Sequence, residues 1–123
     1  MGKFVIRNVP SGIKFDLKAS NGEVILTSEV YSGKAACKGG VASVRKNAPA
    51  AAVEDQTVEG FERQKHPKFV IYLDKAGEYR FRLLATNGQN IGASEGYKAK
   101  ASCVNGIESV KKNAGDAEVT IQA

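Results

Sequence analysis

The chain has 123 residues, 42% of them apolar and 25% charged, and this ordinary globular composition excludes a disordered or low-complexity protein. No apolar run approaches the roughly 20 residues that span a bilayer, and the N-terminus lacks the apolar core of a secretion signal. We therefore expect a cytoplasmic protein without a membrane segment. The net charge of +5 fits a nucleic acid or an acidic protein as partner, but it selects neither.

The first 28 residues predict three strands. Residues 3–7 and 13–17 alternate apolar and polar side chains, as half-buried strands do. The dipeptide Asn21-Gly22 tolerates positive φ in a tight turn and is a strong hairpin signal. Residues 23–28 are therefore predicted to be the returning strand.

The apolar period then lengthens to that of an amphipathic helix, which is predicted over residues 33–46. Asn47 is a candidate left-handed cap, and Pro49 prevents continuation of the helix. Gly40 lies inside this helix, where it costs about 1 kcal/mol relative to Ala. Because it recurs as Gly106, we predict that a strand or the other helix approaches closely there.

One stretch of this first unit occurs twice in the chain. Residues 28–48, SEVYSGKAACKGGVASVRKNA, return as residues 94–114, SEGYKAKASCVNGIESVKKNA. A unit of about 50 residues is marginal alone because so little of its surface can be buried, so we expect the two copies to share one core. The chain is interpreted as a single domain, 1–123, made of repeat 1 (1–48), a linker (49–67) and repeat 2 (68–123).

The second unit follows the plan of the first, with strands predicted at 68–73, 78–85 and 89–94 and a helix at 99–112. The segments 53–58 and 118–121 also alternate, and they are candidate edge strands. The predicted fold class is α+β, with two tandem β-β-β-α repeats.

The repeated pattern resembles a known family. An Asn-Gly turn, Ser-Glu-x-Tyr, and then Lys-Ala-x-Cys-x-x-Gly-(Val/Ile)-x-Ser-Val-(Arg/Lys)-Lys-Asn-Ala is similar to the YegP-like family of small bacterial domains, often found as tandem repeats. The resemblance covers nearly the whole chain, twice. It implies that the two units form a single antiparallel sheet with two helices packed on one face. It also implies that the helices are exchanged between the repeats across a pseudo-twofold axis. It implies no activity, because the family is one of unknown function.

The chain departs from the family pattern at the start of each helix. The family commonly has Ser there, a good N-cap, whereas this chain has Gly33 and Ala99. Ser32 is a candidate substitute cap for the first helix, but Lys98 cannot cap the second. We therefore predict that Ala99→Ser stabilises the protein.

Cys37 and Cys103 occupy equivalent positions, and we expect both to be buried apolar side chains. A disulfide across the pseudo-twofold axis and a reactive thiol are the alternatives. The sequence has no CxxC pair, nucleophile elbow or phosphate loop, and its one histidine, His66, is expected to be solvated in the linker. We predict no metal, no cofactor and no enzymatic activity.

A polar motif recurs in both units and is interpreted as structural. Its members are Ser28, Glu29, Tyr31, Lys34, Ser94, Glu95, Tyr97 and Lys100. A single asymmetric active site would need residues that the copies do not share. Each glutamate precedes a helix N-terminus, where a carboxylate is favourable, and each tyrosine is expected between helix and sheet. The alternative is a pair of polar pockets, which an enzyme would use.

The segment 78–82, EYRFR, supplies the leading functional hypothesis. If Phe81 faces the helices, strand alternation sends Arg80 and Arg82 to the opposite, open face of the sheet. The same face is expected to expose Lys3, Val5, Lys18, Lys68 and Val70. The candidate nucleic-acid-binding residues on it are Arg7, Lys14, Tyr72, Arg80 and Arg82.

A broad basic face with one aromatic side chain has the composition of a weak single-stranded nucleic-acid platform. The alternatives are a solvated face whose cations discourage aggregation, and protein association through this face or an exposed strand edge. Association includes self-association, so a monomer or a weak homodimer is expected.

Overall fold

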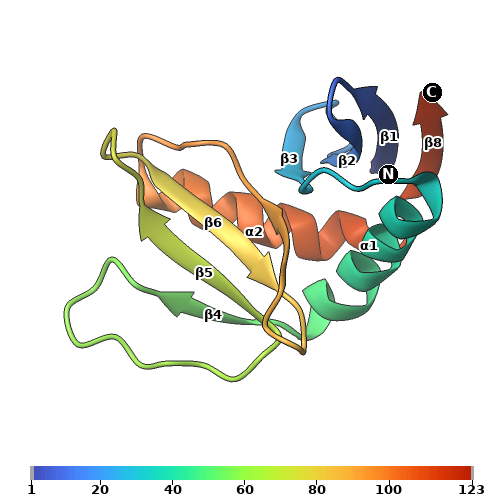
Figure 1. Cartoon of the computed structure of the whole chain (residues 1–123). Helices are drawn as coiled ribbons and strands as arrows, with labels where there is room; N and C mark the ends of the chain where they lie inside the picture. The colour runs from blue at the N-terminus through green and yellow to red at the C-terminus, as the bar shows by residue number, and fades with distance from the viewer. Residues whose placement is uncertain (1, 123) are drawn as a thin grey trace.

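A computed structural model describes residues 2–122, which form an eight-stranded sheet and two α-helices (Figure 1). The first part of the chain contains β1 (Lys3–Val9), β2 (Gly12–Lys18), β3 (Val24–Thr27), α1 (Lys34–Asn47), the 3-10 helix η1 (Ala48–Ala50) and β4 (Ala52–Asp55). The second part contains β5 (Lys68–Leu73), β6 (Tyr79–Leu84), β7 (Asn90–Ala93), α2 (Lys100–Ala114) and β8 (Glu118–Gln122).

The sheet is mixed, with the strand order β4-β5-β6-β7-β3-β2-β1-β8. The six inner strands pair antiparallel, whereas β4 runs parallel to β5 and β8 runs parallel to β1. The prediction of a single antiparallel sheet is therefore wrong at both edges. A parallel pair needs a long crossover connection, and residues 56–67 supply one between β4 and β5. The two predicted edge strands are confirmed.

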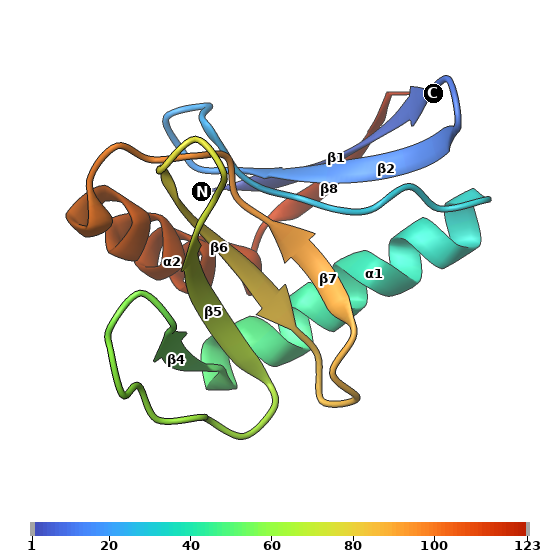
Figure 2. The same cartoon turned by 60° about the vertical axis from the view of Figure 1, so that its left-hand side comes forward.

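Both helices lie on one side of the sheet (Figure 2). Helix α1 contacts β2 and β7, and helix α2 contacts β3 and β6, so each helix touches both parts of the sheet. The buried apolar residues form one core cluster, in which Phe4 meets Phe15 edge-to-face at 5.7 Å and Phe69 meets Phe81 at 5.8 Å. Burying side chains of this kind stabilises the fold by about 1.5–3 kcal/mol each.

The Asn-Gly turns connect β2 to β3 and β6 to β7, so both predicted hairpins are confirmed. Gly22 and Gly88 have φ of 85° and 84°, whereas Asn21 and Asn87 do not have positive φ, so only the glycines use the left-handed conformation. The left-handed cap predicted at Asn47 is wrong. Asn47 has φ −91° and ψ −34°, and its Nδ2 donates to the Ser43 carbonyl at 2.8 Å. The helix passes directly into η1, where Pro49 is tolerated in the first turn.

The glycine inside each helix lies against the sheet side of the core. A Cβ on Gly40 would lie 2.8 Å from Tyr31 Cζ and 3.0 Å from Phe15 Cε2. A Cβ on Gly106 would lie 2.7 Å from the Tyr97 hydroxyl oxygen. The predicted close approach is confirmed, and it comes from side chains on the strand side of the core. Only glycine fits these positions without displacing an aromatic ring.

Both α-helices begin without a side-chain cap. The N-cap residues are Gly33 and Ala99, so the prediction that Ser32 caps α1 is wrong. Ala99 already has the extended backbone of an N-cap, with φ −121° and ψ 141°. A serine hydroxyl there would accept a hydrogen bond from a free N–H of the first turn.

We expect Ala99→Ser to raise the free energy of unfolding by roughly 0.5–1 kcal/mol. Urea denaturation of the purified variant measures this change. The control is Ala101→Ser, an exposed position inside the first turn, where serine costs a few tenths of a kcal/mol in helix propensity. A midpoint for Ala99→Ser no higher than that of the wild type would contradict the prediction.

Candidate functional site

The five candidate nucleic-acid-binding residues form two separate groups on the sheet. Arg7 on β1 lies opposite Lys14 on β2, and Tyr72 on β5 lies opposite Arg80 on β6, with Arg82 two residues further along β6. Strands β7 and β3 lie between the two groups. The structure therefore does not gather these residues into one continuous site.

Each group contains an arginine that is already paired with an aspartate. Arg7 Nε donates to Asp16 Oδ2 at 2.8 Å, and Thr27 Oγ1 donates to the other oxygen of Asp16 at 2.9 Å. Arg80 Nε donates to Asp74 Oδ2 at 2.6 Å. The hydrogen bond from Arg80 lowers the pKa of the Asp74 carboxyl, so this carboxylate stays charged near neutral pH. Both pairs reduce the positive charge available to a phosphate.

The aromatic side chain of the second group is also engaged. The Arg82 guanidinium lies over the Tyr72 ring, with Cζ 4.1 Å from the ring centroid. This is close cation–π geometry, and the guanidinium covers one face of the ring.

Several residues expected to be exposed on this face are buried. Val5, Val70 and Lys68 each have 7% or less of their surface exposed. Lys68 Nζ donates to Glu54 Oε1 at 2.8 Å, and the same oxygen accepts the Gln64 backbone N–H at 2.7 Å. Residues of the 56–67 connection therefore bind to this side of the sheet. The sequence alternation alone predicted a solvent-exposed surface, so that expectation is wrong for these three residues.

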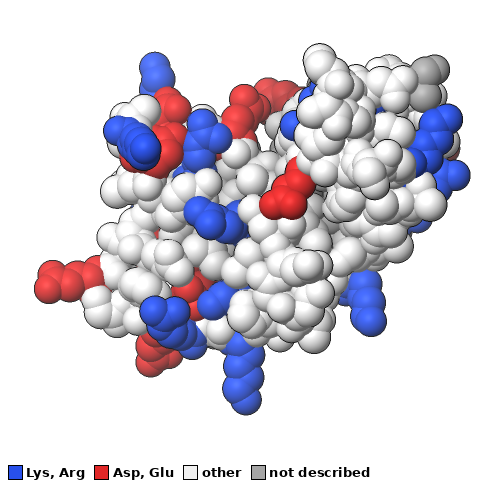
Figure 3. Space-filling view, viewed as in Figure 1, with Lys and Arg blue, Asp and Glu red and all other residues white. Residues whose placement is uncertain are grey.

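Charges of both signs are interspersed on the side of the molecule where β6 lies in front of α2 (Figure 3). Lysine and arginine side chains are separated there by acidic and uncharged ones. This distribution differs from the continuous basic surface expected of a strong nucleic-acid site.

The repeated serines connect neighbouring strands. Ser28 Oγ accepts the Phe15 N–H at 2.9 Å and donates to the Glu29 carbonyl at 2.7 Å. Ser94 does the same with the Phe81 N–H at 2.9 Å and the Glu95 carbonyl at 2.8 Å. Both hydroxyls are fully used within the fold, as the structural interpretation of the motif requires.

The other members of the motif do not converge on a common site. Tyr31 and Tyr97 pack against the helix glycines, and burial raises the pKa of both phenols. Lys34 is exposed, whereas Lys100 Nζ donates to Asp55 Oδ2 at 2.9 Å. Glu29 and Glu95 are exposed.

One shallow hollow of about 340 Å³ lies at the junction of β3 and β7, with Ser28, Ser94, Glu95 and Arg80 in its wall. Arg80 Nη1 donates to the Ser94 carbonyl at 3.3 Å. The hollow joins residues of both copies, whereas the alternative considered from the sequence was two separate polar pockets. Both serine hydroxyls and Arg80 are already bonded within the protein.

The two cysteines are free and fully buried. Burial raises the pKa of the Cys37 thiol, and it raises that of the Cys103 thiol to about 11. Neither thiol is therefore activated as a nucleophile. Within residues 2–122, no group of three or more His, Cys, Asp or Glu side chains is placed to hold a metal ion. No helix in the same range is long and apolar enough to cross a membrane.

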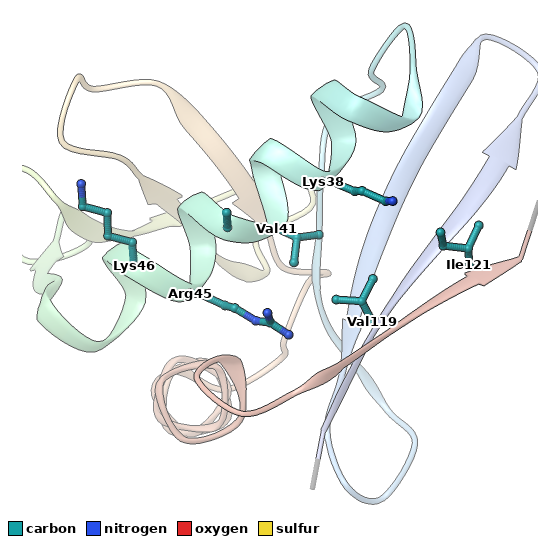
Figure 4. A pocket seen from close by; sticks show the side chains of 7 residues that line it. Lys38, Val41, Arg45, Lys46, Val119 and Ile121 are labelled. Atoms are coloured by element: carbon teal, nitrogen blue, oxygen red, sulfur yellow. The ribbon is translucent and has the colours of Figure 1, made fainter.

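A larger groove, missed by the sequence analysis, lies between α1 and β8 (Figure 4). Its volume is about 650 Å³, and its apolar wall is formed by Val41 and Ala42 of α1 and by Val119 and Ile121 of β8. Lys38 and Arg45 reach from α1 toward β8, whereas Lys46 points away from it. Within residues 2–122, no acidic residue lines the groove. We call it the α1/β8 groove.

Arg45 fixes one end of this groove. Its Nη2 donates to the Ala117 carbonyl, just before β8, and its Cζ lies 5.5 Å from the centroid of the Phe4 ring. Its Nε is buried and has no hydrogen-bond partner in the described structure. The side chain thus holds β8 against α1 while keeping a positive charge at the groove.

The sequence and the fold place the chain in a family. Residues 12–55 and 74–120 both match the family described as "Domain of unknown function (DUF1508)", so the chain belongs to that family. A relative called "UPF0339 protein", from Stutzerimonas stutzeri, is 41% identical over 119 residues, which cover 96% of this chain and 94% of the relative.

Solved structures show the same fold. The solution structure of yegP from E. coli, a protein of unknown function, superposes with a TM-score of 0.80 at 34% identity and covers 98% of this chain and 92% of yegP. A UPF0339 protein from Shewanella oneidensis superposes with a TM-score of 0.78 at 33% identity, with 98% and 90% of the two chains covered. These similarities establish the fold and the YegP-like family.

Some relatives are much shorter. A UPF0339 protein from Methanosarcina acetivorans is 54% identical over 54 residues, which are 44% of this chain but 93% of the relative. A unit of about half this chain is therefore a complete protein elsewhere in the family.

Proposed function

We propose that the protein is a small, non-enzymatic association module that binds another protein through the free edge of β8. The observation that carries the proposal is the exposure of this strand. All five residues of β8 are exposed, and β8 is the last strand of the sheet. An exposed edge strand offers unpaired N–H and C=O groups to an additional strand.

The backbone of Ile121 points away from the sheet. In a parallel ladder, only one residue of each opposed pair directs its backbone groups at the other strand. At the other edge, Gln56 donates its N–H to the Ile71 carbonyl, so Ile71 is the engaged residue and Asp55, opposite it, points outward. At the β8 edge, Ile121 lies opposite Ile6, as Asp55 lies opposite Ile71. The N–H of Ile121 is therefore available to a partner strand.

The β4 edge is better protected than the β8 edge. Glu54 on β4 is buried and binds Lys68 and the Gln64 N–H, and Asp55 is paired with Lys100. In contrast, β8 presents Val119 and Ile121 with about 40% of their surface exposed. Two apolar side chains beside free backbone groups favour β8 as the association edge.

The test selects random decapeptides, displayed on phage, for binding to the purified protein and compares two variants at one position. Ile121→Pro removes the outward N–H, which an edge strand tolerates, whereas Ile121→Ala shortens the side chain and keeps the N–H. We expect selected peptides to bind Ile121→Pro about tenfold more weakly than Ile121→Ala. Equal affinities for the two variants, or a selection that yields no binder, would refute association through β8.

A second candidate function is weak binding of single-stranded nucleic acid by the sheet face. The pair of Arg82 and Tyr72 favours it, because a guanidinium stacked on an aromatic ring presents a flat cationic surface to a base. Lys14 and the exposed parts of Arg7 and Arg80 would contact phosphates.

Fluorescence anisotropy of labelled single-stranded RNA and DNA tests this candidate at about 50 and 200 mM salt. Arg82→Glu is compared with Lys75→Glu, an exposed loop position with the same change in charge. Binding that falls with salt and is lost only in Arg82→Glu would support a nucleic-acid site. Equal losses in the two variants would indicate a non-specific effect of net charge.

We also infer that the two halves are tandem copies that exchange their helices. The supporting observations are the two segments that match the same family and the contacts of each helix with strands of both halves. The strand after each helix likewise pairs with the other half, β4 with β5 and β8 with β1. Expressing residues 1–60 and 61–123 as separate chains tests this inference, since neither fragment should fold as a monomer and the mixture should form a folded heterodimer.

A further inference from the structure

We infer that the α1/β8 groove binds an extended peptide segment of another protein whose sequence alternates apolar and acidic side chains. This inference rests on the proposed association through β8 and adds the chemistry of the partner. A strand added to β8 would direct alternate side chains toward α1, along the groove.

The groove matches such a segment in both polarity and charge. Val41, Val119 and Ile121 give it an apolar wall, which suits an apolar side chain of the added strand. Lys38 and Arg45 provide positive charge, and none of the described residues that line the groove is acidic. Complementary charge across an interface selects the partner and speeds its association.

The β4 edge of the same sheet has a carboxylate–lysine contact that the β8 edge lacks. On β4, Asp55 lies opposite Ile71 and binds Lys100 Nζ, at the start of α2, at 2.9 Å. On β8, the residue opposite Ile6 is Ile121. Lys34 is the first residue of α1, as Lys100 is the first residue of α2.

Lys34 therefore lacks the carboxylate that its counterpart binds, because Ile121 stands where the other edge has Asp55. Among the described residues, Lys34 forms no ion pair. A glutamate or aspartate of a strand added to β8 would supply the missing carboxylate to Lys34 or Lys38.

A second copy of this chain fits the groove less well than a foreign segment. Pairing β8 with β8 of another copy would bring Lys38 and Arg45 of the two molecules together, which is repulsive. Pairing β8 with β4 of another copy is a head-to-tail contact, which repeats along a filament unless it closes into a ring. Charge repulsion disfavours the first arrangement, and the second does not close into a dimer, so the structure favours a foreign acidic strand.

The probes are three capped octapeptides, (Val-Glu)4, (Val-Thr)4 and (Val-Lys)4, titrated into the ¹⁵N-labelled protein. All three can extend a sheet, and their alternate side chains are acidic, neutral and basic. We expect (Val-Glu)4 to bind about tenfold more tightly than (Val-Thr)4, and (Val-Lys)4 to bind more weakly than both. The amide signals that shift are expected to belong to α1 and β8.

Two double variants distinguish the effect of charges at the groove from the effect of net charge. Lys34→Glu/Lys38→Glu reverses the two lysines on the α1 side and should weaken (Val-Glu)4 by about tenfold or more. Lys65→Glu/Lys75→Glu makes the same change in net charge at exposed loop positions and should alter the affinity by no more than about twofold. Equal losses in both double variants would overturn the assignment of the acidic contact to the groove.

The outcomes distinguish this inference from the function on which it rests. If (Val-Thr)4 binds as tightly as (Val-Glu)4 and both are lost in Ile121→Pro, the acidic specificity is wrong and association through β8 stands. If no octapeptide binds at millimolar concentration, or Ile121→Pro leaves binding unchanged, both proposals fail. A protein dimer abolished by Ile121→Pro would identify a second copy as the occupant. If the groove binds dodecanoate and none of the octapeptides, it is a small-molecule site and the peptide proposal is wrong.

Discussion

Replacing Lys68 with Ala is expected to lower the free energy of unfolding by about 3–5 kcal/mol, the largest effect we expect of any single substitution discussed. Lys68 Nζ is the cationic partner of Glu54, whose carboxylate is 1% exposed on β4. Without the ammonium group, Glu54 remains buried as an uncompensated charge or must take up a proton. Urea denaturation at pH 7 measures the loss.

Lys3 provides the matched control. It occupies on β1 the place that Lys68 occupies on β5, but it is exposed and forms no ion pair among the described residues. Lys3→Ala should therefore change stability by less than about 0.5 kcal/mol. The double variant Glu54→Leu/Lys68→Met should recover most of the loss, because it removes both buried charges. A loss below about 1 kcal/mol for Lys68→Ala would show that the pair is far better solvated than the structure indicates.

The same pair gives the protein an acid-sensitive contribution to stability. Burial alone would raise the pKa of Glu54, but hydrogen bonds from Lys68, Gln56 and the Gln64 N–H outweigh it and lower the pKa to about 2. A carboxyl whose folded pKa is depressed stabilises the fold above its unfolded pKa, near 4.5, and loses that contribution as the pH falls toward 2. The difference in unfolding free energy between wild type and Glu54→Gln should therefore shrink between pH 4.5 and 2.

Gly40→Ala should destabilise the protein by about 2 kcal/mol, although alanine is the better helix former. The gain in helix propensity is about 1 kcal/mol, whereas forcing a methyl group into a packed core costs about 1–3 kcal/mol. The cost falls at the upper end here because the new Cβ would collide with the Tyr31 hydroxyl and lie 3.0 Å from Phe15 Cε2. Thermal and urea denaturation both measure the change.

The neighbouring residue is the control for this prediction. A Cβ on Gly39 meets nothing within 4 Å, so Gly39→Ala should stabilise the protein by about 1 kcal/mol. Gly106→Ala in α2 should repeat the loss, since its Cβ would lie 3.0 Å from Phe81 Cε2. If Gly40→Ala proved as stabilising as Gly39→Ala, Tyr31 would have to move freely, and the glycine would not be required by packing.

The order and type of the elements could be read from the sequence, but the direction of the edge strands could not. Turn chemistry at Gly22 and Gly88 and the change from a two-residue to a helical period are local signals, and local signals identified the hairpins and helices. The strands with which β4 and β8 pair depend on where the preceding helix ends relative to the sheet. The local sequence at 52–55 and 118–122 does not predict that position.

The candidate site shows the same limit. Alternation correctly sent Arg80 and Arg82 to the side of the sheet away from Phe81. It could not reveal that Asp74 pairs with Arg80 and Asp16 with Arg7, nor that Val70 is buried. The α1/β8 groove could have been suspected from one difference between the copies. Asp55 and Ile121 are equivalent residues once β4 and β8 are known to occupy equivalent positions. Asp55 pairs with Lys100, whereas Ile121 offers no carboxylate to Lys34.

The pairing of β1 with β8 sets the order in which the molecule can be completed during translation. Residues 3–7 acquire their outer neighbour only when residues 118–122 have left the ribosome. Until then, the outer edge of β1 stays unpaired while the chain is still bound to the ribosome. In contrast, β4 and β5 are separated by only 12 residues and can already pair. The β4–β5 pair is therefore expected to form before the β1–β8 pair. The outer edge of β1, though made earliest, is expected to be among the last parts of the sheet to gain protection from hydrogen exchange.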